Sequence, residues 1–259
     1  MSNIIDDIRQ DWNSRKENHK NFKSEIIYKM NSLKDTFKGR KAVIITCGPS
    51  MKKVSTTAMQ SLIDKGYVIV CVKQSIDDMP NKFAHFHVYN FCNEKKYSYN
   101  KKVCDTISLY CQCPKKLERK QNTDIVISHI PHDEKDNILT AMMKGRDEMS
   151  FDKIISRSDL QVKWGDTMYE LAIPLCIQIG VSEIYIIGWD CKNFSERFYK
   201  NNKKEKRNAK RKRLDKLQLD ASKHLGPFMK NKYDIVLKLV GKPDTSALDI
   251  DSVETASLI

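Results

Sequence analysis

The sequence predicts an α/β fold: a Rossmann-like, mostly parallel sheet with helices on both faces, plus N-terminal amphipathic helices and a basic helical lid. Two observations lead to this prediction. Apolar runs rich in Val and Ile, at 41–46, 67–72 and 183–188, are typical of strands buried on both faces, as in parallel sheets. Segments with a helical pattern, at about 55–65 and 167–179, alternate with these strands, as expected for βαβ units.

Residues 1–38 are polar and charged, with apolar side chains at roughly helical spacing. These side chains are Ile4, Ile5, Ile8, Trp12, Phe22, Ile26, Ile27, Met30, Leu33 and Phe37. The spacing predicts an N-terminal extension of one or two amphipathic helices that lies on the main domain.

Residues 39–240 are predicted to form one Rossmann-like nucleotide-binding domain, because a chain of 259 residues with 40% apolar residues can bury one large core. Further strands are expected at 84–90, 106–111, 124–128 and 233–240. The polar stretch 131–160 is interpreted as an insertion or small cap, and 197–230 as a basic helical lid. For the acidic tail 241–259 we expect either a short helix at about 245–257 or disorder unless it docks.

The first candidate site is the turn that follows the strand at 41–46. Thr46 and Cys47 end this strand, and Gly48-Pro49-Ser50 follows. Glycine permits a close approach of the backbone, proline restricts φ, and Ser50 can cap the next helix. Amides at such a helix start can bind a phosphate, so we predict that the amides of Gly48 and Ser50 do so. An ordinary strand-to-helix turn remains the alternative.

The second candidate site lies around the helix at 167–179 and the strand at 183–188. Gly180 occupies the position of a helix C-terminal glycine, and Pro174 predicts a kink or a lost hydrogen bond inside the helix. The strand ends in Gly188-Trp189-Asp190, which puts a carboxylate at the carboxyl edge of the sheet. Open α/β folds bind their ligands at this edge.

The start of the same helix is predicted to face the same crevice. Gly165, Asp166 and Thr167 would offer amides and a hydroxyl there. The alternative is that Thr167 and Asp190 only cap the elements that follow them.

The two motifs resemble a superfamily that contains motility-accessory-factor flagellin glycosyltransferases, archaeal 6-hydroxymethylpterin pyrophosphokinase-like proteins and bacterial family 42 sialyltransferases. The resemblance rests on the Gly-Pro-Ser turn in 37–54, on a polar pair after the second strand, Lys73-Gln74, and on the G-x-T and G-x-D elements in 165–190. It implies a nucleotide-binding domain with donor phosphates near the Gly-Pro-Ser turn. The Asp190 edge would line the nucleotide or sugar pocket.

The resemblance also implies a reaction that needs no metal or other cofactor, with a histidine as general base. Here the histidine available after Asp190 is His224, which lies late in the chain and inside a predicted helix. We therefore take Asp190 or His224 as the candidate base, and Tyr199 as a neutral donor to the leaving nucleotide.

The function predicted from these features is transfer of a sugar from a nucleotide-activated donor to a hydroxyl acceptor. The donor expected is a CMP-linked nonulosonate similar to sialic acid, and the acceptor, a glycan or glycoprotein, is unknown. Two alternatives stay open: an ATP-dependent pyrophosphokinase-like enzyme that uses magnesium, and a non-catalytic basic module that binds nucleic acid or another anionic surface.

The chain's positive charge is concentrated in one block. Of the net charge of +13, the segment Lys200 to Arg213 carries +8, from nine positive residues and one Glu. Such a block is often only a solvated stretch, but it can also contact a phosphate, an anionic surface or nucleic acid.

The sequence predicts no membrane-spanning segment and no metal site. No run approaches the roughly 20 apolar residues of a membrane helix, so we expect a cytoplasmic protein, with peripheral contact to a membrane left open. The eight cysteines include no C-x-x-C pair and are interpreted as reduced thiols. The spacing of Cys111, Cys113, His129 and His132 matches no standard zinc site.

Overall fold

A nine-stranded sheet forms the centre of the protein in the computed structural model. The structure describes residues 4–90, 106–112, 123–129, 151, 155–156, 161–162, 167–189, 223–241, 251–253 and 258. The strands are β1 (Lys41–Ile45), β2 (Val68–Val72), β3 (Phe86–Asn90), β4 (Ile107–Gln112), β5 (Ile125–His129), β6 (Gln161–Val162), β7 (Glu183–Ile187), β8 (Val236–Val240) and β9 (Asp251–Val253). Their order is β6-β5-β4-β3-β2-β1-β7-β8-β9, and every described pair is parallel. The predicted α/β fold with a parallel sheet is confirmed, whereas most of the predicted basic lid lies outside the described residues.

Strand β1 shows why a continuous apolar run was a good indicator of a central strand. Ile44 pairs with Val70 of β2 on one side and with Ile186 of β7 on the other. Ile44 packs into the larger core cluster, whereas its neighbours Val43 and Ile45 pack into the smaller cluster. Because successive side chains of a strand point to opposite faces, β1 is covered on both sides.

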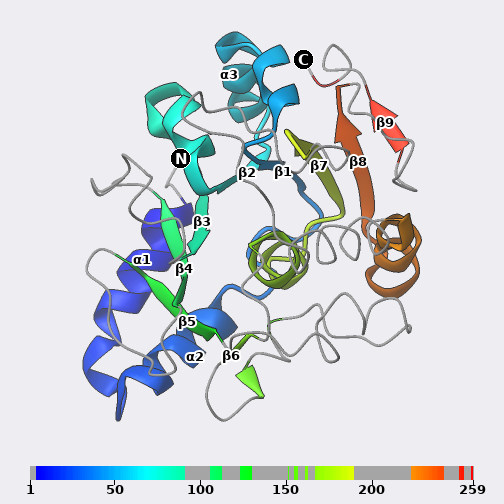
Figure 1. The fold of residues 1–259 in the computed structure, drawn as a ribbon. Coiled ribbons are helices and arrows are strands. Elements are labelled where there is room, and N and C mark those ends of the chain that lie inside the picture. The colour runs from blue at the N-terminus through cyan, green and yellow to red at the C-terminus, as the bar shows by residue number, and fades with distance from the viewer. Residues whose placement is uncertain are drawn as a thin grey trace, which may run out of the picture.

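Helices form a layer on each face of the sheet. Helix α3 (Thr56–Asp64) contributes Met59 and Leu62 to the smaller cluster. The opposite face carries α1 (Ile4–Ser14), α2 (Phe22–Ser32), α6 (Ile173–Gln178) and the helical residues 223–233, whose buried side chains belong to the larger cluster. In Figure 1, α3 lies on one side of β1, β2 and β7, and the helix that leads into β7 lies on the other.

Both amphipathic helices expected near the N-terminus are present, and they pack into the main core. Their buried apolar residues are Ile5, Ile8, Trp12, Ile26 and Met30. Polar contacts tie them to the sheet as well. Arg9 of α1 donates to the carbonyl of Thr106 at 2.5 Å, and Lys29 of α2 donates to the carbonyl of Asp124 at 3.1 Å.

The helix before β7 begins as a π-helix, η6 (Met168–Ala172), and continues as α6. The reason is Pro174, which has no N–H to donate and whose ring would clash with the carbonyl of residue 170 in a regular α-helix. The predicted disturbance at Pro174 is therefore confirmed. Gly180 ends this helix with φ +78°, as its sequence position indicated.

Two expectations from the sequence are wrong. Ser50 does not cap the helix after β1: it lies inside a short 3-10 helix, η2 (Pro49–Lys53), and the cap of α3 is Ser55, which accepts from the amide of Ala58 at 3.1 Å. The tail forms strand β9 where a helix was one expectation. Residues 251–253 of β9 pair with residues 238–240 of β8. Docking on this sheet edge therefore overrides the weak strand propensity of the segment.

Parts of the prediction fall on residues outside those described. Most of the predicted insertion at 131–160 and of the lid at 197–230 is among them. The two-residue strand β6, which pairs with β5, was not predicted from the sequence. Among the described helices, none is both long and apolar enough to cross a membrane.

Candidate functional site

The strand order reverses direction between β1 and β7. After β1 the chain passes to α3, which packs on the face of the smaller cluster. After β7 the next described helix, at 223–233, places Leu225 and Met229 in the larger cluster on the opposite face. Connections that leave neighbouring strands toward opposite faces create a crevice at the carboxyl edge of a parallel sheet. The ends of both sequence motifs therefore lie at one such switch point.

Hydrogen bonds join the two strand ends at the base of this switch point. The amide of Thr46 donates to Ile187 at 2.9 Å, and the amide of Gly48 donates to the carbonyl of Gly188 at 2.8 Å. The Thr46 hydroxyl also donates to the Ile187 carbonyl, at 3.2 Å. The prediction that the Gly48 amide binds a phosphate is therefore wrong, because its one hydrogen is already donated to β7.

Gly188 makes this close junction sterically feasible. Its φ is +77°, and a Cβ at this position would lie 2.7 Å from the carbonyl oxygen of Thr46. A side chain would therefore collide with backbone and would also strain the left-handed conformation. This is a physical reason for the glycine of the second motif.

The turn after β2 lies next to the end of β1 and contains the predicted pair Lys73-Gln74. Gln74 is buried, with 8% of its surface exposed. The Cys47 thiol donates to the carbonyl of Val72 at 3.2 Å and lies 3.3 Å from the Gln74 Oε1. The structure thus brings together Cys47 and Gln74, which the sequence had singled out separately.

Lys73 has a left-handed backbone, with φ +60°. The other three described non-glycine residues with positive φ are Asp35, Asn81 and Asp234, whose short polar side chains tolerate this region best. A lysine in this conformation is uncommon, and such strain is retained only where the surroundings enforce it.

Two residues that hold this turn escaped the sequence analysis. Ser75 donates to the carbonyl of Ile45 in β1 at 2.7 Å and accepts from the amide of Val72 at 3.0 Å. The His87 Nε2 of β3 lies 2.9 Å from the Lys73 carbonyl oxygen. Burial lowers the pKa of His87 to about 4, although the bond to Lys73 opposes this shift. A serine three residues after the end of a strand can indicate that its hydroxyl bonds the turn backbone. A histidine inside an apolar strand does not indicate such a role.

The start of the helix before β7 lies at the same carboxyl edge. Its C-terminal end is at the amino edge, where the Ser182 amide donates to the Arg40 carbonyl at 2.9 Å, so the helix runs opposite to the strands. Thr167 is buried and makes no side-chain capping bond, which excludes the capping alternative for this residue. Tyr169 packs edge-to-face on Trp189, with ring centroids 5.6 Å apart. The two ends of the second motif are thus in contact.

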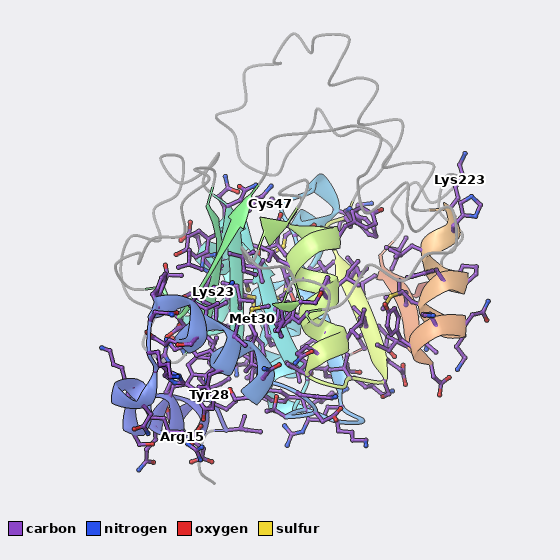
Figure 2. The ribbon with its side chains drawn as sticks, turned by 90° about the horizontal axis from the view of Figure 1, so that it is seen from below. Arg15, Lys23, Tyr28, Met30, Cys47 and Lys223 are labelled. Carbon is purple, nitrogen blue, oxygen red and sulfur yellow. The ribbon has the colours of Figure 1, made fainter. Side chains whose placement is uncertain are left out.

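Most of the other site residues predicted from the sequence are not described by the structure. Gly165, Asp166, Asp190 and Tyr199 lie outside the described residues. His224 is exposed in the helical segment 223–233. Its neighbour Lys223 and the site residue Cys47 both lie toward the same end of the molecule in Figure 2, opposite to Arg15.

The described residues hold no group of three or more His, Cys, Asp or Glu side chains that could bind a metal ion. Cys111 and His129 lie on the neighbouring strands β4 and β5, and Cys113 and His132 are not described. Cys47, Cys71 and Cys176 are free thiols, and burial strongly raises the pKa of the last two. Cys47 is thus the most accessible thiol of these three.

No protein-family model matches the chain, and no curated protein matches it either. The resemblance to the glycosyltransferase and pyrophosphokinase-like superfamily therefore stays a prediction from the motifs. The fold and the meeting of the two motifs are independent of it, because they follow from strand order and hydrogen bonds.

Proposed function

We propose that this protein is glycosyltransferase-like and binds a nucleotide-activated sugar in the crevice between the ends of β1 and β7. The observation that carries the proposal is the switch point itself. Two motifs far apart in the sequence end neighbouring strands, and the next described helix after each of them packs on a different face of the sheet. Ligands of open α/β sheets bind at such points.

The residues around the crevice suit a phosphate and a neutral polar group. Lys73 would neutralise the leaving nucleotide, and the Ser50 amide, which the sequence also indicated, would bind a donor phosphate. Cys47, Gln74 and Thr167 offer neutral polar groups. Trp189 offers a flat apolar face, with its ring fixed by Tyr169.

Transfer of the sugar requires a group that removes the proton of the acceptor hydroxyl and groups that stabilise charge on the departing nucleotide. Asp190 or His224 is the proposed base, and Tyr199 the proposed donor to the leaving group. We propose a CMP-linked nonulosonate as donor, with no cofactor required for the reaction.

A thermal-shift panel of CMP, CDP, UDP, GDP and ATP, each with and without magnesium, tests this function. A ligand that binds only the folded state raises the melting temperature, by an amount that grows with its concentration relative to Kd. We expect the largest rise with CMP, unchanged by magnesium. The matched controls are Gly188→Ala, which crowds Thr46, and Gly66→Ala, a left-handed glycine with open space around it. The shift should be lost only in the first.

The other results of this panel have definite meanings. A rise that requires both ATP and magnesium would replace the proposal by a pyrophosphokinase-like activity. The absence of any nucleotide response would overturn nucleotide-sugar binding.

A second function, contact with an anionic surface or nucleic acid, is favoured by the +8 charge of Lys200 to Arg213. Neutralising five of these positive residues should abolish retention on single-stranded nucleic acid or anionic vesicles. Binding before neutralisation should fall steeply with salt. Retention that survives the change would overturn this function without affecting the first.

A further inference from the structure

The turn that carries Lys73 is held from two neighbouring strands. From β1, the Ile45 carbonyl accepts from Ser75 at 2.7 Å. From β3, His87 reaches the Lys73 carbonyl at 2.9 Å. The backbone immediately before and after Lys73 is thereby fixed relative to the sheet, which explains how a lysine stays in a left-handed conformation.

His87 is itself immobilised. Only 4% of its surface is exposed, and its ring stacks on Tyr89 with centroids 5.0 Å apart and 22° between the planes. The Tyr89 hydroxyl is in turn hydrogen-bonded to the Thr123 hydroxyl at 2.5 Å. The turn after β2, strand β3 and the segment before β5 are thus linked through the stacked rings of His87 and Tyr89.

The chemistry of the bond fixes the state of His87. A backbone carbonyl can only accept a hydrogen bond, so Nε2 must carry the hydrogen. Burial disfavours the charged ring, so His87 donates as a neutral imidazole at neutral pH.

We infer that His87 is a positioning residue: it donates to the Lys73 carbonyl and thereby holds Lys73 in the orientation that contacts the phosphate of the bound nucleotide. This inference rests on the proposed function for the identity of the ligand. It adds a residue that none of the motifs contains and that lies on a strand outside both of them.

The test compares two histidines of the same chain. His85 is also largely buried, with its pKa lowered to about 4 by burial, but its Nδ1 accepts from the amide of Ile69 at the amino end of the sheet. His85→Leu is therefore the matched control for His87→Leu. His87→Gln keeps an N–H donor at the end of the side chain and is the rescue variant.

The measurement is the Kd for CMP by titration calorimetry for the wild type, His87→Leu, His87→Gln, His85→Leu, Lys73→Met and the double variant His87→Leu/Lys73→Met. We expect His87→Leu to weaken binding about 3- to 10-fold, the range of one net hydrogen bond. His87→Gln should stay within about twofold of the wild type, and so should His85→Leu. The double variant should bind no more weakly than Lys73→Met alone, because His87 acts through Lys73.

Hydrogen exchange of residues 72–76 gives a readout that needs no ligand. His87→Leu should speed exchange in this segment at least about tenfold, because the turn opens more often without the His87–Lys73 hydrogen bond. His85→Leu should leave the exchange unchanged. If CMP binds but the effects of His87→Leu and Lys73→Met are additive, the inference is overturned and the proposed function stands. If no nucleotide binds, the proposed function is overturned. If hydrogen exchange is unchanged in His87→Leu, the positioning role is overturned, whether or not a nucleotide binds.

Discussion

At its amino end the β1–β7 pair is joined through backbone bonds between the turn before β1 and the end of the helix before β7, whereas after its carboxyl end the next described helices, α3 and 223–233, pack on opposite faces. The amino end is bridged by backbone bonds of 2.9 Å from Asp35 to Gln178, from Phe37 to Ile179 and from Gly39 to Gly180. The carboxyl end carries Cys47, Gln74 and the left-handed Lys73. The amino end of the strand pair is closed by these backbone bonds, whereas the carboxyl end gathers polar side chains from two turns.

Each end also contains a left-handed glycine that a side chain would crowd. At Gly180 the nearest atom to an added Cβ is the Asp35 Oδ1, at 2.7 Å. At Gly188 it is the Thr46 carbonyl oxygen, also at 2.7 Å. The amino end is thus crowded first by the tip of a flexible side chain, and the carboxyl end by rigid backbone.

The largest expected effect is a pH dependence of the stability that comes from two histidines, His85 directly before β3 and His87 within it. Burial lowers the pKa of His85 and of His87 from 6.5 to about 4. The unfolded chain therefore binds more protons than the folded one between these values. The contribution of these two histidines to stability is fully present above about pH 6.5 and is lost as the pH drops toward 4, by roughly 3 kcal/mol for each histidine.

Urea unfolding at pH 7, 6, 5 and 4.5 checks this, with His85→Gln and His87→Gln as separate variants. Each variant should reduce the number of protons taken up on unfolding, which sets the slope of the unfolding free energy against pH, by about one. If only one of them does, the other histidine has nearly the same pKa in the folded and the unfolded chain, and burial does not shift it as expected.

The next effect is a graded series of glycine substitutions. Gly188→Ala should cost about 2–5 kcal/mol, because overpacking against backbone adds to left-handed strain. Gly180→Ala should cost less, since the Asp35 side chain can rotate away. Gly66→Ala, with open space around it, should cost only the strain of about 1–2 kcal/mol.

The free energies of unfolding in urea rank the three variants. Equal losses at Gly188 and Gly66 would show that the carboxyl end relaxes around a side chain, and the contrast between the two ends would then be lost.

The smallest expected effect is at the amino end. Lys41 Nζ lies 3.0 Å from Glu183 Oε1, and Lys238 Nζ lies 3.4 Å from Glu183 Oε2. The Tyr185 hydroxyl, followed by Lys41, lowers the pKa of Glu183. The Lys41 side chain is 47% exposed, so Lys41→Met should change the stability by less than about 1 kcal/mol, and less still in 0.5 M salt.

A loss of several kcal/mol in Lys41→Met would mean that this ion pair, rather than the backbone bridges, holds the amino end. Lys38→Met, at an exposed lysine in the turn before β1, is the control.

Much of the fold could be predicted because the signals are local. The apolar runs of β1, β2 and β7 have no polar alternation, so they indicated buried parallel strands, and Gly180 indicated a helix end. The tail was harder. Asp251-Ser252-Val253 has weak strand propensity, and only the available edge of β8 makes it a strand.

The site was predicted in part. Thr46, Cys47, Gln74, Gly188 and Trp189 do lie at one carboxyl edge, as the turns after their strands indicated. The Gly48 amide was assigned to a phosphate because a Gly-Pro-Ser turn shows no sign of its hydrogen-bond partner, a carbonyl contributed by a distant strand.

By itself, the sequence determined that the apolar runs of β1, β2 and β7 become buried strands, that a helix ends at Gly180, and that two motifs end at the same edge of a parallel sheet. These properties depend on side-chain periodicity and turn chemistry over a few residues. Only the tertiary structure decided that Gly48 is bonded to Gly188 and that His87 reaches the carbonyl of Lys73. Such contacts depend on strand order and register. They join residues far apart in the sequence, so the local sequence around one residue does not indicate its partner.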